Sequence, residues 1–175
     1  MNAIELLKDQ HKKTKAALEK GSKGKLSGAE SKKAADELVA HMVIEEHVFY
    51  PRVRELLKDL VTESYEEHTT ARFSLARCLS AKTEEEIKSR FTVLKELIEH
   101  HVKEEEEEMF PKVQKGIDAE ELELLGTRMQ AMFEQAAELG LDALVSGLEK
   151  TLRSPNQTQN GVARSKDKAP RPSAR

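Results

Sequence analysis

Two stretches of the chain share one pattern, HMVIEEHVFYP over residues 41–51 and HVKEEEEEMFP over residues 101–111. In each, a histidine is followed four positions later by a glutamate and six positions after that by a proline. The repeat extends upstream, because His11 precedes His41 by 30 residues and His68 precedes His101 by 33. The sequence therefore predicts two copies of a helical hairpin, each carrying a histidine and then a His-x3-Glu pair.

Helical periodicity surrounds all of these residues. Apolar side chains recur at the i, i+3, i+4 spacing of a buried stripe, and this spacing puts His11 on the inner face of a helix over about residues 2–20. The same spacing predicts a second helix from about residue 28 to about Asp59, a third whose stripe spans residues 61–78, and a fourth that begins after Thr83. Each repeated histidine and glutamate falls on such an inner stripe.

Short connections between successive long helices favour antiparallel neighbours. We therefore expect an all-α fold, an up-down-up-down antiparallel four-helix bundle over residues 1–115. Further helical periodicity predicts a C-terminal extension over residues 116–152, interrupted at Gly140, that caps or flanks the bundle. Residues 153–175 are small, polar and basic without periodicity, which predicts a disordered basic tail.

Composition and charge exclude several classes of protein. The formal net charge of −3 is too small to imply a nucleic-acid partner. No apolar run approaches the ~20 residues that cross a bilayer, so we expect no membrane partner. The single cysteine, Cys78, rules out an internal disulfide, and the N-terminal residues lack the apolar stretch of a signal peptide. We expect a cytoplasmic protein, of an oligomeric state that the sequence leaves open.

The cost of burying charge indicates a bound metal. Glu45 and Glu105 fall at core positions, where an uncompensated carboxylate costs several kcal/mol. Bound cations compensate such carboxylates in the cores of helical bundles. Because positions i and i+4 share one helical face, His41 with Glu45 and His101 with Glu105 can each converge on a shared centre.

The number and type of ligands narrow the choice of metal. Four imidazoles and two carboxylates are too many for one tetrahedral zinc, and a thiolate cluster is lacking. If both glutamates bridge a pair of metals and each metal takes two histidines, six-coordinate iron keeps open positions for an oxo or hydroxo bridge and for dioxygen or peroxide. Manganese also suits these ligands, and zinc remains an alternative in vitro.

These motifs resemble the hemerythrin-like, or HHE cation-binding, family over roughly residues 2–115. The resemblance includes the Phe-Tyr-Pro and Met-Phe-Pro endings at residues 49–51 and 109–111. It implies a four-helix bundle that holds two iron ions, and the stretch over residues 123–129 is similar to an extension of bacterial hemerythrin-like proteins, some of which decompose hydrogen peroxide. The matching ligand positions are His11, His41, Glu45, His68, His101 and Glu105.

The chain departs from the oxygen-carrying hemerythrins at two positions. Those proteins have a second histidine where this chain has Arg72, and an aspartate where it has Glu106. Glu105 fits the HHE subgroup better, and Glu106 is the alternative ligand. Loss of one histidine implies a more open iron, which favours peroxide or redox chemistry over reversible oxygen carriage. Tyr50 could approach the vacated position as a hydrogen-bond donor or as a phenolate ligand.

Three classes of function fit these observations. The first is a di-iron protein that senses, stores or handles dioxygen or peroxide, and the second is a catalase-like enzyme on the same scaffold. The third is a metal-free structural or adaptor bundle.

A single His-x3-Glu pair is usually a surface ion pair, but the duplication of this pair with matching prolines favours a metal site. His47 and His100 lie off the inner stripes and are interpreted as surface residues; Asp9 and Glu67 could accept hydrogen bonds from ligands.

Overall fold

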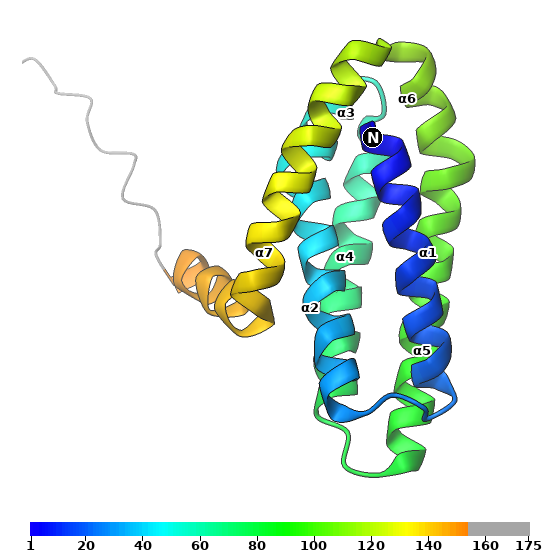
Figure 1. Cartoon of the computed structure of the whole chain (residues 1–175), viewed down its shortest axis with the longest axis vertical. Coiled ribbons are helices and arrows are strands. Elements are labelled where there is room, and N and C mark those ends of the chain that lie inside the picture. Colours follow the sequence, from blue (N-terminus) through cyan, green and yellow to red (C-terminus); the bar gives the residue numbers. More distant parts are fainter. Residues whose placement is uncertain (154–175) are drawn as a thin grey trace, which may run out of the picture.

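Within residues 1–153, four antiparallel helical columns form the body of the molecule (Figure 1). This computed structural model describes the backbone of those residues and the side chains of residues 1–140. The columns run up-down-up-down, which confirms the predicted fold class. In chain order they are α1 (Ala3–Ser22), then α2 (Gly28–Ile44) continued by η1 (Glu45–Phe49) and α3 (Tyr50–Val53), then α4 (Lys58–Leu79), and then α5 (Glu84–Glu104) continued by η2 (Glu105–Met109) and α6 (Phe110–Gly116).

A further helix, α7 (Ala119–Arg153), flanks the bundle and packs against α1 and α2. Gly126 makes this close approach possible, because a Cβ there would lie 2.5 Å from the backbone oxygen of Met1. The predicted interruption at Gly140 is confirmed: its φ of 70° is left-handed and breaks the helix. The boundary at residue 115 stays a prediction, and the predicted tail lies, from residue 154 on, outside the described residues.

One predicted helix boundary is wrong. The second column ends at Val53 and the next helix starts at Lys58, so Asp59 belongs to α4 rather than to the end of the second column. The backbone N–H groups of Leu56 and Leu57 both donate to the carbonyl of Val53, and Leu57 leaves the helical region at φ −141°. Asp59 then lies in the first turn of α4, where a carboxylate interacts favourably with the helix dipole.

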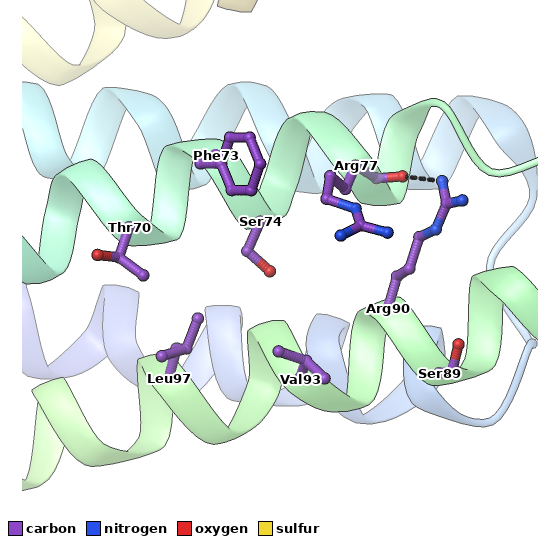
Figure 2. Close-up of a pocket in the computed structure, with 8 residues that line it drawn as sticks. All are labelled: Thr70, Phe73, Ser74, Arg77, Ser89, Arg90, Val93 and Leu97. Carbon is purple, nitrogen blue, oxygen red and sulfur yellow. Dashed lines mark hydrogen bonds between the residues drawn. The ribbon is translucent and has the colours of Figure 1, made fainter.

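The outer seam between α4 and α5 carries an open cavity of about 320 Å³. Figure 2 shows Phe73 and Val93 along its length and Arg77 and Arg90 at one end. Arg90 donates to the backbone oxygen of Arg77 at 2.7 Å. None of the described residues that line this cavity is acidic. Among the described residues, no helix combines the length and apolarity that crossing a membrane requires.

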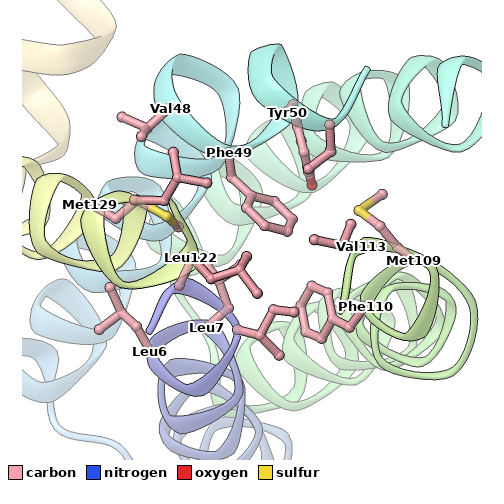
Figure 3. Close-up of a cluster of buried hydrophobic side chains, with 14 of the residues drawn as sticks. Leu6, Leu7, Val48, Phe49, Tyr50, Met109, Phe110, Val113, Leu122 and Met129 are labelled. Atoms are coloured by element: carbon pink, nitrogen blue, oxygen red, sulfur yellow. The ribbon is translucent and has the colours of Figure 1, made fainter. Parts of the chain in front are cut away.

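The core consists of two apolar clusters separated by a polar layer. On α1, Leu7 belongs to the first cluster and Leu18 to the second, while buried Gln10 and His11 lie between them. Figure 3 shows the first cluster, which α7 completes with Leu122 and Met129. Burial of each large aliphatic side chain contributes about 1.5–3 kcal/mol. The two clusters therefore hold the columns together on both sides of a polar layer that contains the repeated histidines and glutamates.

Candidate metal centre

The structure brings together all six residues that the sequence predicts as ligands. Each column contributes one histidine at mid-height, and each of the two π turns begins with a glutamate. All six side chains are buried, with at most 3 % of any residue exposed. They are His11, His41, Glu45, His68, His101 and Glu105.

The Glu45 carboxylate faces histidines from both copies of the repeat. We call His11 and His41 the first half-site, and His68 and His101 the second half-site. In the first, Glu45 Oε1 lies 3.2 Å from Nε2 of His41 and 3.9 Å from Nε2 of His11. Its other oxygen lies 3.3 Å from Nε2 of His68, in the second half-site. Glu45 therefore spans the two half-sites, as a bridging carboxylate must.

Glu105 occupies the equivalent position in the second copy. Its Oε2 lies 3.2 Å from Nε2 of His11 and 3.6 Å from Nε2 of His101. Within the second half-site, Nε2 of His68 and Nε2 of His101 are 3.1 Å apart. The arrangement is thus pseudo-twofold, with two imidazoles on each side and one carboxylate from each copy reaching both sides.

The outer nitrogen of every imidazole contacts a side-chain oxygen. Such a contact fixes the Nδ1–H tautomer and leaves the Nε2 lone pair directed at the centre, which is how metal-binding histidines are held. The Nδ1 contacts are His11 with Glu106 (2.9 Å), His41 with Gln10 (2.7 Å), His68 with Glu46 (2.9 Å) and His101 with Glu67 (2.7 Å).

Five of the inner atoms of the site lack hydrogen-bond partners. Within the described residues, the buried side-chain atoms without a partner include Nε2 of His11 and His41, both oxygens of Glu45 and Oε2 of Glu105. Each unsatisfied buried polar atom costs about 1–3 kcal/mol. One or more cations at the centre would satisfy all five atoms, so the donor set fits a metal.

The electrostatics of the metal-free site show how protons substitute for cations. Burial alone would lower the pKa of His68, but the adjacent carboxylates of Glu45 and Glu46 raise it to about 9. Burial would also lower the pKa of His11, but its carboxylate partners raise that pKa well above the ordinary value. Burial lowers the pKa of His41 to about 3. One imidazole of each half-site therefore carries a proton that a bound metal must displace.

Matching π turns place the two glutamates. In the first, the N–H of Tyr50 donates to the carbonyl of Glu45, five residues back, and in the second the N–H of Phe110 donates to the carbonyl of Glu105. Pro51 and Pro111, which lack an N–H, come two residues after the last residue of each turn. Each column widens by one residue at its π turn and continues through the proline as α3 or α6. Such π turns frequently mark functional sites.

Tyr50 breaks the pseudo-twofold symmetry. Its fully buried hydroxyl donates to Glu105 Oε1 at 2.9 Å and lies 3.2 Å from Nε2 of His68. Burial, together with the charges of Glu105 and Glu45, raises the pKa of Tyr50 well above its ordinary value, so the hydroxyl keeps its proton. The equivalent Phe110 offers only an apolar ring, which stacks on His11 at 5.9 Å.

The contacts on the outer nitrogens include residues that sequence reasoning missed. Gln10 and Glu46 were not identified, and Glu106, the alternative ligand, contacts the outer nitrogen of His11 instead. The sequence did contain a signal, because each acceptor adjoins a ligand in the chain. Gln10 and Glu67 each precede a histidine ligand, of α1 and of α4. Glu46 and Glu106 each follow one of the two glutamate ligands. Glu67 contacts His101 in place of its neighbour His68.

The remaining candidates lie away from the centre. Asp9 is half-buried and pairs with Lys13. His47 and His100 are exposed, as predicted. Arg72, which stands where the oxygen carriers have a histidine, does not contribute a ligand and instead forms a two-bonded ion pair with Glu46, at 2.8 Å for each bond.

A family model for the hemerythrin HHE cation-binding domain matches residues 2–113. The chain belongs to this family. The match covers the four columns and all six converging residues, and it supports an iron-binding helical protein. Comparisons with curated proteins and with solved structures found no match. Membership of the bacterial hemerythrin-like subgroup stays a prediction.

Proposed function

We propose that this HHE protein holds two iron ions and uses them to bind dioxygen or hydrogen peroxide, in sensing, storage or redox handling. His11 and His41 would hold one ion, His68 and His101 would hold the other, and Glu45 and Glu105, which face both half-sites, would be shared between them. The observation that carries the proposal is the set of five buried atoms without partners, which belong to both imidazoles of the first half-site and to both carboxylates. One ion held between His11 and His41 would still leave Glu45 Oε2, which faces His68 of the second half-site, without a partner.

Two irons with an oxo or hydroxo bridge supply electron exchange with dioxygen or peroxide when bound. The chain supplies the surroundings. Carboxylate acceptors on three of the four outer nitrogens raise the basicity of the imidazoles, which favours the oxidised state of iron. The two apolar clusters exclude bulk water from the polar layer. Tyr50 holds a proton at its hydroxyl beside the second half-site, where it can donate to an oxygen ligand.

Decomposition of hydrogen peroxide to water and dioxygen is the second candidate function, and Tyr50 favours it. Peroxide cleavage needs a proton at the departing oxygen, and general acids in that position contribute about 10²–10⁴ in rate. A pure storage site gains less from a buried hydroxyl that donates to a bridging carboxylate. We also keep the prediction of a reducing, cytoplasmic setting, which the single buried Cys78 favours.

The test combines iron content, the ultraviolet–visible spectrum and dioxygen evolution after peroxide is added. The proposal predicts bound iron whose oxo-bridge bands change with peroxide, and loss of that response in His101→Ala but not in His47→Ala. Dioxygen evolution that follows the same pattern supports the catalase-like function. A folded protein that refuses iron would contradict both candidates and favour the metal-free structural bundle.

A further inference from the structure

A second group of metal-binding side chains lies at the surface, on the seam between α4 and α5. Nε2 of His100 is 3.6 Å from Glu67 Oε1 and 3.6 Å from Glu104 Oε1. One ligand atom from each of the three residues lies within 4.8 Å of the others. The side chains of Glu67 and Glu104 are 20 % and 28 % exposed and that of His100 is 63 % exposed, so this group, unlike the buried centre, is open to solvent.

Glu67 connects the surface group to the buried centre. One of its oxygens faces His100, while the other accepts from Nδ1 of His101 at 2.7 Å. The same carboxylate therefore contacts a solvent-exposed imidazole and a buried imidazole of the second half-site. Since His100 and His101 are consecutive on α5, the two groups are separated by a single residue position.

A cavity of about 240 Å³ runs from this surface group to the second half-site. Glu63 and Glu66 line it as well, and neither Lys nor Arg occurs among the described residues of its lining. Its lining includes both histidines of the second half-site. The lining residues that carry this argument are Glu63, Glu66, Glu67, His68, His100 and His101.

The adjoining cavity on the same seam has the opposite character. The two share Thr70 and Leu97, but the neighbour contains Arg77 and Arg90 and, among described residues, no carboxylate (Figure 2). A cation that approaches the seam is repelled at one end and attracted at the other. Clefts lined by one sign of charge raise the local concentration of oppositely charged ligands.

We propose that Glu67, His100 and Glu104 form an entry site that captures ferrous iron from solution and delivers it through the acidic cavity to the buried centre. Three ligands at a solvated surface leave half of the six coordination positions of the ion to water, so the ion binds weakly and moves on. Glu67 is a positioning residue for both groups. This inference rests on the proposed function, because it assigns a route to the ions that the buried centre holds.

The test is the rate at which metal-depleted protein takes up ferrous iron without oxygen, followed as iron protected from a fast chelator. The His100→Ala/Glu104→Gln variant removes the entry site without touching a buried ligand. The His47→Ala/Glu107→Gln variant is the matched control, because it removes one exposed imidazole and one exposed carboxylate elsewhere. We expect uptake about tenfold slower in the first variant at low ionic strength, wild-type rates in the control, and equal final iron in both.

Salt gives a second readout. Wild-type uptake slows as ionic strength rises, and uptake by the entry-site variant slows less, because the variant lacks the charge of Glu104 but keeps the acidic cavity. If circular dichroism shows that a metal-depleted protein is unfolded, exchange of labelled iron into the loaded protein replaces uptake, with the same expected ratio.

The outcomes separate the two proposals. Equal rates in the entry-site variant and the control overturn the entry site and leave the di-iron centre in place. Reduced final iron in the entry-site variant also overturns it, because His100 or Glu104 would then belong to the centre itself. Wild-type protein that holds no iron overturns the proposed function and, with it, this inference.

Discussion

The two half-sites share what is needed to hold a metal and differ in what surrounds it. Each has two imidazoles whose Nε2 atoms face a pair of carboxylates, and each outer nitrogen has an acceptor at an equivalent position of the repeat. The equivalent contacts are His41–Gln10 with His101–Glu67, and His11–Glu106 with His68–Glu46. The differences are Gln10 against Glu67 and Phe110 against Tyr50.

These differences all favour reactivity at the second half-site. An anionic acceptor makes an imidazole a stronger ligand than a neutral amide does, so Glu67 strengthens His101 more than Gln10 strengthens His41. The second half-site has the buried hydroxyl, whereas the first has an apolar ring on His11. The acidic cavity also reaches only the second pair of histidines. The comparison supports the proposal that both halves hold a metal and that the second half-site carries the reaction with peroxide.

Removal of a bridging carboxylate should have the largest effect, because both half-sites use it. We expect Glu45→Ala, and equally Glu105→Ala, to reduce bound iron from two ions per chain to one or none. Glu107→Ala, at an exposed position of the same acidic run, is the control and should keep full iron. Iron measured by plasma emission against protein concentration decides the matter, and undiminished iron in either bridging variant would show that these carboxylates do not bridge.

Substitution of Tyr50 or Phe110 removes the chemical difference between the two half-sites. Tyr50→Phe makes the second half-site resemble the first, and peroxide decomposition should fall by about 10² because the proton donor is lost. Iron content should stay unchanged. The exchanged variant Tyr50→Phe/Phe110→Tyr moves the hydroxyl to the first half-site and tests whether a tyrosine on either side suffices for peroxide decomposition. Wild-type rates of dioxygen evolution by Tyr50→Phe would show that the Tyr50 hydroxyl is not the proton donor.

Exchange of the outer acceptors should have a more modest effect. Glu67→Gln weakens the second half-site, and we expect about tenfold lower iron affinity there, at the lower end of the range for such contacts. Gln10→Glu should strengthen the first half-site in turn. Equilibrium titration with graded chelators measures both and is independent of entry rate. Identical titration curves for wild type and both variants would mean that the acceptors do not tune the imidazoles.

The smallest effect concerns pH and the metal-free protein. The pKa of His68 is about 9, above its ordinary value of 6.5, because its bonds to Glu45 and Glu46 outweigh burial. The folded state thus holds this proton more tightly than the unfolded chain, so the stabilisation is complete below pH 6.5 and is lost as pH rises through about 9.

Thermal unfolding of both forms across this window provides the check. The melting temperature of the metal-free protein should fall between pH 6.5 and 9. Iron-loaded protein should lack this fall, because a metal has replaced the proton of His68. Parallel pH profiles for the two forms would contradict the exchange of a proton for a metal.

The ligands could be predicted from the sequence because the repeat fixes both spacing and helical phase. Five consecutive glutamates at residues 104–108 left two candidates, and the phase set by His101 selected Glu105, which the structure places inside. The outer contacts could not be predicted, because they depend on which columns are neighbours. Glu46, for example, reaches His68 across the interface between η1 and α4.

Two further features could not be predicted from the sequence: the π turns, and the packing of α7 against α1 and α2. Pro51 and Pro111 are compatible with a helix end, a kink or a widened turn, and tertiary packing chooses among them. Gly126 lies in a segment of helical periodicity with no local sign that it contacts the N-terminal backbone.

Mössbauer spectroscopy of the protein loaded with ⁵⁷Fe tests the central claim most directly. Two inequivalent half-sites that share bridging carboxylates predict two quadrupole doublets of equal area and, in the oxidised protein, a diamagnetic ground state from coupled irons. A single magnetically isolated ferric signal, or iron that does not remain bound, would contradict a centre built from both halves of the repeat.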